Sequence, residues 1–298
     1  MYQTLNQTKE KQIQREEICL EDSLKSLIEV TEPYYSLTNL SIDEENVLKA
    51  DVNKQLDCAH EVKGMSYSEA GRHLAILGSL ALAKSNPVKE KHYYLATKAY
   101  VKRVYQQAYD EIEHVGYMST IHFDRKKGIA KGYLNTKTGK KVYTITVEYQ
   151  VLSWRLFERM FKQHKQETPC LEGYNPYAES IPLFDLKTSE DSSSATLGVI
   201  NKDICVGHFD DYPALPVARI AQVLTSIAGI QNNASGLTEP MKIKHVILYA
   251  KSFLFAGETM SVKSVLESST ESSDENVIDT FAFSNDDTEY SARLTCWI

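Results

Sequence analysis

A chain of 298 residues, 42% of them hydrophobic, is long enough to bury one large core or two medium ones. Its formal net charge of -7 argues against a general affinity for nucleic acid, and no apolar run is long enough for a transmembrane helix. The five cysteines form no Cys-x-x-Cys pair, and the polar leader Met1–Glu17 lacks the apolar segment of a signal peptide. We therefore expect a reduced, cytoplasmic protein with no nucleic-acid or membrane partner.

The first half of the chain is predicted to contain a strand, a long helix and four further strands. Apolar residues recur at helical spacing within Met65–Ser85, and Ser66 or Ser68 is a suitable N-cap. The preceding segment, Val47–Leu56, alternates loosely, as a strand does. The later strands are expected over His92–Tyr105, Asp110–His122, Lys127–Leu134 and Lys141–Val151.

The second half repeats this order of elements, and we place the boundary near residue 166. A helix over Trp154–Lys165 ends the first domain, residues 1–165. In the second domain, residues 166–298, an apolar helix over Val217–Ile230 lies between predicted strands. These strands are expected over Ala195–Val206, His245–Phe255, Met260–Glu267, Val277–Phe283 and Tyr290–Trp297. The serine-rich stretches Thr188–Ser194 and Ser268–Glu275 are predicted to be loops.

The most informative stretch is the loop Gly207–Pro216, which leads into the second apolar helix. It contains a histidine, His208, and two prolines that restrict the backbone around them. The helix that follows is apolar nearly all round, so other structure must surround it. A rigid histidine loop that enters a buried helix favours an active site at this point.

This loop and helix carry a resemblance to a known family. The pattern His-Phe-x-x-x-Pro-x-x-Pro-Val, followed by Ile-Ala-Gln-Val-Leu-Thr-Ser-Ile-Ala-Gly, resembles the signature of bacterial 3-hydroxyacyl-ACP dehydratases of the hotdog fold. The repeated halves resemble double-hotdog polyketide enzymes. The resemblance implies an α+β fold, a tandem double hotdog with two antiparallel sheets, each wrapped around a long buried helix. Because such hotdogs work as dimers, the chain would be a pseudo-dimer, and formation of a further homodimer is left open.

The resemblance also implies roles for individual residues. His208 would abstract a proton from the substrate as the general base. The family's catalytic acid falls at Gln222, which cannot release a proton, so Glu69 on the first helix is the alternative acid. His60 precedes the first helix as His208 precedes the second, and belongs either to a second site or to a relic of the duplication. The residues predicted to bind substrate are Gly207, Tyr212, Pro216, Val217 and Tyr67, and further candidates for catalysis are His73, Asp210 and Asp211.

The sequence thus predicts a dehydratase-like lyase. Its substrates would be 3-hydroxyacyl thioesters of acyl carrier protein or coenzyme A, in fatty-acid or polyketide biosynthesis. Two alternatives stay open: a double-hotdog thioesterase or acyltransferase/decarboxylase that uses the same carriers, and a non-catalytic protein that binds an acyl chain. We expect no metal or other cofactor, because the sequence has neither a glycine-rich phosphate loop nor a His/Cys ligand cluster.

Overall fold

The computed structural model describes residues 20–167, 173–209, 211–237, 239–267, 276–285 and 288–298. Its strands in the first half are β1 (Leu37–Ile42), β2 (Leu48–Asn53), β3 (His92–Arg103), β4 (Glu113–Phe123), β5 (Lys127–Thr136) and β6 (Lys141–Ser153). Those in the second half are β7 (Phe184–Thr188), β8 (Ser192–Val199), β9 (His245–Ala250), β10 (Thr259–Glu267), β11 (Val277–Ser284) and β12 (Ala292–Trp297). The helices are α2 (Tyr67–Ser85), α3 (Trp154–Phe161) and α4 (Val217–Ala234), with 3₁₀ turns over Lys162–His164, Pro176–Ala178 and Lys202–Cys205.

The strands form one antiparallel sheet whose two halves mirror each other. Its order is β1-β2-β4-β5-β6-β3-β9-β12-β11-β10-β8-β7. Each half therefore contains two strands, a long helix and four more strands in chain order, and each places its strands in the same spatial order, counted from its outer edge. The predicted repetition of the architecture is present in this topology.

The sequence predicted two separate sheets, and on this point the structure differs. Strand β3 pairs with β9 from Lys98↔Tyr249 to Lys102↔His245, which joins the halves edge to edge. On one side of this junction Val101 and Val246 are buried, and on the other the Lys98 ammonium lies over the Tyr249 ring. The pairing gives an edge strand of each half a partner, so the sheet continues through the middle of the molecule.

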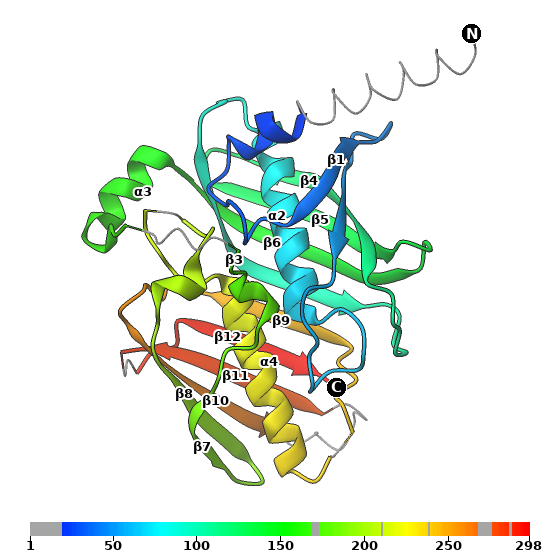
Figure 1. Cartoon of the computed structure of the whole chain (residues 1–298), viewed down its shortest axis with the longest axis vertical. Coiled ribbons are helices and arrows are strands. Elements are labelled where there is room, and N and C mark those ends of the chain that lie inside the picture. The colour runs from blue at the N-terminus through cyan, green and yellow to red at the C-terminus, as the bar shows by residue number, and fades with distance from the viewer. Residues whose placement is uncertain (1–19, 168–172, 210, 238, 268–275, 286–287) are drawn as a thin grey trace.

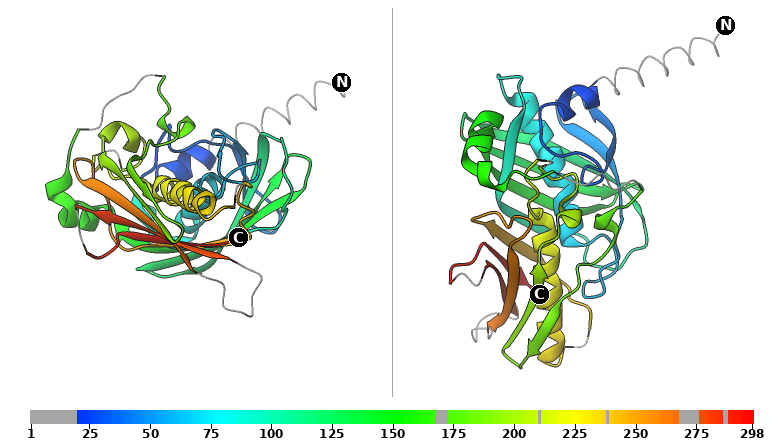
Figure 2. Two further views of the ribbon diagram at one scale, coloured as in Figure 1. Left: turned by 90° about the horizontal axis from the view of Figure 1, so that it is seen from below. Right: turned by 60° about the vertical axis from the view of Figure 1, so that its left-hand side comes forward.

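Helices α2 and α4 lie on the same face of this sheet, one beyond the other along the long axis of the molecule, and contact each other near its middle (Figures 1 and 2). Helix α2 packs on β2 to β6, and α4 packs on β7, β8 and β10 to β12. The N-cap of α2 is Ser66, one of the two predicted caps, and its hydroxyl accepts a hydrogen bond from the Glu69 amide. Both helices are buried over most of their length, as their apolar sequences predicted.

Two strands, β1 and β7, escaped prediction. Strand β1 contains an irregularity at Asn39, whose φ of 55° breaks the pleat. Strand β7 is exposed at every position, and together with β8 it occupies much of the stretch predicted to be a serine-rich loop. The strand predicted over Ala195–Val206 ends at Val199 and continues as a 3₁₀ turn. The polar leader and the loop predicted over Ser268–Glu275 lie outside the described residues.

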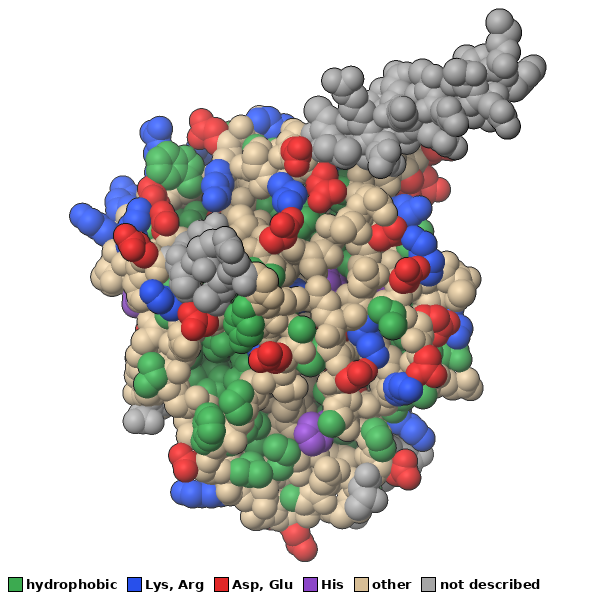
Figure 3. Space-filling view, viewed as in Figure 1, with side chains coloured by type: hydrophobic (Ala, Val, Ile, Leu, Met, Phe, Trp, Pro, Cys, Tyr) green, Lys and Arg blue, Asp and Glu red, His purple; other side chains and the backbone are tan. Residues whose placement is uncertain are grey.

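The face in Figure 3 carries charged side chains of both signs over much of its area. Hydrophobic side chains gather toward its lower left, over β7 and β8, where Phe184, Leu186 and Val199 are exposed. Because β7 is an edge strand, this apolar surface lies at an open edge of the sheet. Whether a second copy covers it stays a prediction. None of the helices in the described part of the chain has the length and apolarity needed to cross a membrane.

The close approach of α2 to the sheet depends on a glycine. A Cβ built on Gly78 would lie 2.3 Å from the Tyr149 hydroxyl, which donates to the Ala75 carbonyl at 2.8 Å. We therefore expect Gly78→Ala to break this contact and lower the free energy of unfolding by roughly 1–3 kcal/mol. Urea denaturation measures the change.

The same helix offers a matched control for this substitution. A Cβ on Gly71 would meet nothing within 4 Å. Because alanine favours helix over glycine, Gly71→Ala should raise the stability by roughly 0.5–1 kcal/mol. Equal effects of the two substitutions would show that packing against Tyr149 does not limit this position.

Candidate active site

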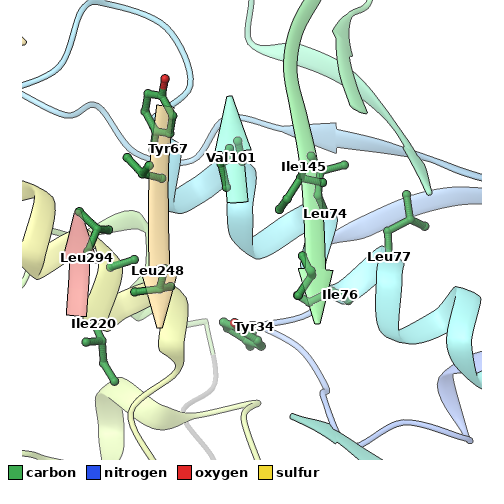
Figure 4. Packing of buried hydrophobic residues seen from close by; sticks show 14 of the residues in the cluster. Tyr34, Tyr67, Leu74, Ile76, Leu77, Val101, Ile145, Ile220, Leu248 and Leu294 are labelled. Atoms are coloured by element: carbon green, nitrogen blue, oxygen red, sulfur yellow. The ribbon is translucent and has the colours of Figure 1, made fainter. Parts of the chain in front are cut away.

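A cavity of about 510 Å³ lies between the two long helices and the centre of the sheet. Figure 4 shows part of its wall, to which α2, α4 and the strands β3, β9 and β12 contribute. The labelled residues in this wall are Tyr34, Tyr67, Ile76, Val101, Ile220, Leu248 and Leu294. The cavity therefore spans the junction of the two halves and is mostly apolar. Such a space suits an acyl chain better than a highly charged ligand.

His208 reaches this cavity from a loop held on two sides. Gly207, with φ of 80°, brings the chain so close to the segment 31–34 that an added Cβ would lie 2.5 Å from the Thr31 carbonyl oxygen. The Thr31 amide donates to the Gly207 carbonyl at 2.9 Å, and Val30 forms a bridge with His208. The next residue, Phe209, has φ of 59°, a conformation that residues other than glycine seldom adopt. The histidine is thus fixed by backbone contacts.

The hydrogen bonding of His208 defines its protonation state. Its Nδ1 lies 2.9 Å from the Ala214 carbonyl oxygen, which can only accept, so Nδ1 carries the proton. Burial lowers the pKa of His208 to about 4, although the bond to Ala214 opposes this shift. At neutral pH the imidazole is therefore uncharged, and Nε2 has a free lone pair. This is the state that a general base requires.

The start of α4 lies beside His208 in the cavity wall. Pro216 is the N-cap residue, and its carbonyl accepts from the Arg219 and Ile220 amides at 2.8 and 3.0 Å. Among the described residues, the amides of Val217 and Ala218 have no backbone acceptor, and both residues line the cavity. Free amides at a helix N-terminus attract negative charge. They can stabilise an oxyanion that forms next to His208.

The other predicted binding residues divide into two groups. Tyr67 and Val217 line the cavity, but the Tyr67 hydroxyl is already bonded to the Ile243 carbonyl at 2.7 Å. Gly207, Tyr212 and Pro216 are not in the described cavity wall. Tyr212 instead packs in an aromatic cluster, with its ring 5.5 Å from that of Phe157. These three residues belong to the loop that carries His208 and lie outside the described cavity wall.

Two residues were considered for the role of the catalytic acid, Gln222 and Glu69. Neither of them lies in the described cavity wall. The Gln222 side chain accepts a hydrogen bond from the Arg219 guanidinium. The Glu69 carboxylate accepts from the Gln55 amide and lies 3.7 Å from Nε2 of His73. His73 is itself fully buried and also lies outside the cavity wall. Asp211 pairs with Lys165 at 3.3 Å, and Asp210 is outside the described residues.

The loop before α2 differs from the loop before α4. His60 packs against α4, so close that a Cβ on Gly229 would lie 2.3 Å from the His60 Cβ, and it does not line the described cavity. The next residue, Glu61, accepts a hydrogen bond from the Tyr67 amide at 3.0 Å. Tyr67 is the first residue of α2, so a carboxyl group of the protein itself occupies this helix N-terminus. The first amide of α2 is therefore bonded within the protein, whereas that of α4 has no backbone acceptor among the described residues.

Glu29 is a cavity residue that the sequence reasoning missed. It precedes Val30, the bridge partner of His208, and lines the cavity with only 3% of its surface exposed. Its Oε1 has no hydrogen-bond partner among the described residues. Burial raises the pKa of Glu29 well above its usual range, against the opposing effects of Lys91 and of nearby backbone amides. Its only signal in the sequence is an acid between apolar residues, Ile28 and Val30.

Among the described residues, the cysteines and the metal-binding residue types give no further site. Burial raises the pKa of both Cys58 and Cys205 to about 12, so neither is a thiolate at neutral pH. Within the described ranges, no three His, Cys, Asp or Glu side chains are grouped so that they could share a metal ion.

Solved structures show which fold this is. A protein from Alicyclobacillus acidocaldarius, described as having the hotdog fold and unknown function, superimposes with a TM-score of 0.50 at 12% identity, over 90% of this chain and 97% of its own. An oleoyl thioesterase from Lactobacillus plantarum gives 0.56 at 12% identity, with coverage of 84% and 95%. An acyl-ACP thioesterase from Bacteroides thetaiotaomicron gives 0.53 at 13% identity, with coverage of 86% and 99%. No protein-family model and no curated protein matches the sequence. The chain has the α+β hotdog fold.

The buried carboxyl at the start of α2 leads to a test of stability against pH. Burial raises the pKa of Glu61 from 4.5 to about 7. As the pH rises from 4.5 to 7, the unfolded chain ionises this group before the folded protein does, so the folded state loses stability. The substitution Glu61→Gln keeps an acceptor for the Tyr67 amide and removes this loss. We expect the variant to be more stable than wild type by roughly 1–3 kcal/mol at pH 8.

Thermal unfolding at pH 5 and pH 8 measures this effect. At pH 5 Glu61 is largely protonated in the folded state, so the advantage of the variant should nearly vanish. An advantage of the same size at both pH values would contradict the raised pKa.

Proposed function

We propose that this protein hydrolyses acyl thioesters, with His208 as the general base. The observation that carries the proposal is the pairing of a neutral imidazole with free amides at the start of α4, in one apolar cavity. The solved structures of similar fold that are described as thioesterases support the same chemistry, which was one of the alternatives from the sequence.

The reaction needs only groups that this cavity contains, together with water. Water attacks the thioester carbonyl carbon while Nε2 of His208 takes one of its protons. The carbonyl oxygen becomes an oxyanion and accepts hydrogen bonds from the Val217 and Ala218 amides. The carbon–sulfur bond then breaks, and the thiolate takes the proton from the imidazolium. The products are a carboxylic acid and the free thiol of the carrier.

Hydrolysis fits this site better than the predicted dehydration. Loss of water from a 3-hydroxyacyl group requires an acid to protonate the departing hydroxyl, and Gln222 cannot act as one. A thiol with a pKa of roughly 8.5 leaves readily as thiolate, so hydrolysis does not need that acid. An enzyme without an acid at Gln222 can therefore still be a thioesterase.

We further propose that each half of the chain is one hotdog unit, with the division near residue 166. Two features support this division. The strand order of one half mirrors that of the other, and each half has one long helix, α2 or α4, packed on its own strands. In this arrangement the chain is a pseudo-dimer with one working site, at His208. In the first half the Glu61 carboxyl already accepts from the first amide of α2, and His60 does not line the described cavity.

The carrier is proposed to be acyl carrier protein or coenzyme A, both of which are anionic. The cavity reaches the surface at Met160, which lines it and is 48% exposed. Three exposed cations, Arg155, Arg159 and Lys162, lie on or next to the same helix, α3. Positive charge at the entrance would guide a negatively charged carrier to it.

Substitution of the base is the central test. We expect His208→Ala to lower kcat for acyl-CoA hydrolysis roughly 10²–10⁴-fold, because water loses its proton acceptor. Release of thiol, followed with a thiol reagent, measures the rate. In the wild type, kcat/KM should fall only as the pH approaches 4, since burial lowers the pKa of His208 to about 4. Intact-mass analysis of the products confirms that the acyl group is lost as the free acid.

A second histidine serves as the matched control. The substitution His60→Gln changes the corresponding loop of the first half, away from the described cavity wall. It should leave kcat within roughly a factor of two of wild type. Full activity in His208→Ala, or equal losses in both variants, would contradict the assignment of the base.

The entrance cations give a separate prediction. In the double variant Arg155→Glu/Arg159→Glu, we expect KM for acyl-ACP to rise about tenfold, because the entrance would repel an acidic carrier. The matching acyl-pantetheine, which has no phosphate, should be hydrolysed at an unchanged rate. Steady-state kinetics at low and high salt measures both. A KM for acyl-ACP that does not change would place carrier docking elsewhere.

A further inference from the structure

The cavity wall contains an acidic group, Glu29, that the proposed hydrolysis does not use. Its side chain lies in the wall of a space that is otherwise mostly apolar. A buried carboxyl oxygen without a hydrogen-bond partner costs free energy, roughly 1–3 kcal/mol. An unsatisfied buried group in a native structure calls for an explanation, and a role at a functional site is one of the known ones.

The position of Glu29 relates it to the thioester end of a bound substrate. Val30, the next residue, pairs with His208, and the Tyr34 ring contacts the imidazole edge with centroids 5.1 Å apart. The segment 29–34 therefore covers the same part of the cavity in which His208 would act. A group that Glu29 contacts would lie close to the carbonyl, not at the far end of the acyl chain.

Several other polar groups in this wall are already bonded within the protein. The Ser79 hydroxyl donates to the Ile76 carbonyl at 2.8 Å, and the Thr97 hydroxyl donates to the Glu148 carbonyl at 3.2 Å. The Glu258 carboxylate accepts from the Phe255 amide at 2.9 Å. Glu29 differs from them because its Oε1 has no partner among the described residues. Burial raises the pKa of Glu29, which favours the carboxylic acid, a form that can donate a hydrogen bond as well as accept one.

We propose that Glu29 forms a polar subsite that selects acyl chains bearing a hydroxyl or carbonyl oxygen close to the thioester. The inference rests on the proposed hydrolysis and specifies its substrate class: hydroxyacyl and oxoacyl thioesters rather than plain fatty acyl thioesters. A hydroxyl oxygen on the chain would fill the open hydrogen-bonding position of Glu29, and a carbonyl oxygen would accept its proton. A plain chain would leave the carboxyl unsatisfied, and discrimination against substrates that lack a hydrogen-bonding group is typically strong.

The test compares three thioesters of one chain length: decanoyl-CoA, 3-hydroxydecanoyl-CoA and 3-oxodecanoyl-CoA. In the wild type, kcat/KM for the oxygenated substrates should exceed that for decanoyl-CoA by roughly tenfold, the effect of about one hydrogen bond to a buried group. In Glu29→Leu the preference should invert, since the subsite becomes apolar. In Glu29→Gln, whose carboxamide still donates and accepts, part of the preference should remain.

A control variant and a stability measurement guard against misfolding. The substitution Ser79→Ala removes a hydroxyl from the same wall that is already bonded within its helix, so it should leave the ratio of the rates at the wild-type value. The melting temperature of Glu29→Leu should rise, because the substitution removes an unsatisfied buried carboxyl. A fall in melting temperature together with an unchanged ratio would overturn the subsite.

The outcomes separate this inference from the proposed function. Hydrolysis of all three thioesters at similar rates, unaffected by Glu29→Leu, would overturn the subsite and leave the thioesterase standing. Absence of thiol release from every substrate would overturn the thioesterase. In that case the thermal shift caused by each CoA ester, in the wild type and in Glu29→Leu, would still decide whether Glu29 selects oxygenated chains. Loss of water from 3-hydroxydecanoyl-CoA, abolished in Glu29→Gln, would overturn both, because Glu29 would then be the acid of a dehydratase.

Discussion

The pairing of β3 with β9 is the contact on which the candidate site depends. It joins two six-stranded halves into one 12-stranded sheet and brings α2 and α4 into contact on one face. The space that remains between the two helices and the strands at the junction is the cavity. Without this pairing, His208 from the second half and the segment around Val30 from the first would not meet. The cavity is therefore a property of the pair and belongs to neither half alone.

The two halves share a topology but have diverged at the corresponding helix N-termini. In the second half, Pro216 leaves the first amides of α4 open to the cavity. In the first, the Glu61 carboxyl fills the corresponding place at α2 and makes it a structural helix cap. The N-terminus of each helix favours negative charge, and the two helices differ in the group that accepts hydrogen bonds from the first amides. At α2 the Glu61 carboxyl accepts from the first amide, whereas at α4 the proposed mechanism uses the first amides to bind the substrate oxyanion.

Burial sets the charge state of the site more strongly than any pairing of charges. His208 and Glu29 are both almost fully buried, and in each the loss of water disfavours the charged form. The pKa of His208 is lowered and that of Glu29 is raised, so in both groups burial favours the neutral form. Neutral groups in an apolar cavity suit the binding of an uncharged acyl group. They also explain why an excess of acidic residues over the whole chain says little about the site.

Local pattern was enough to determine the two long helices, most of the strands and the histidine loop. Apolar periodicity reports which face of an element is buried, and the loop before α4 carried a recognisable spacing of histidine and prolines. The single continuous sheet, the orientation of Gln222 toward Arg219 and the presence of Glu29 in the cavity were decided by the tertiary structure. The physical reason is that apolar periodicity shows which face of an element is buried but does not identify the element that packs against that face. The partner of an edge strand and the surroundings of a polar side chain come from residues far away in the sequence.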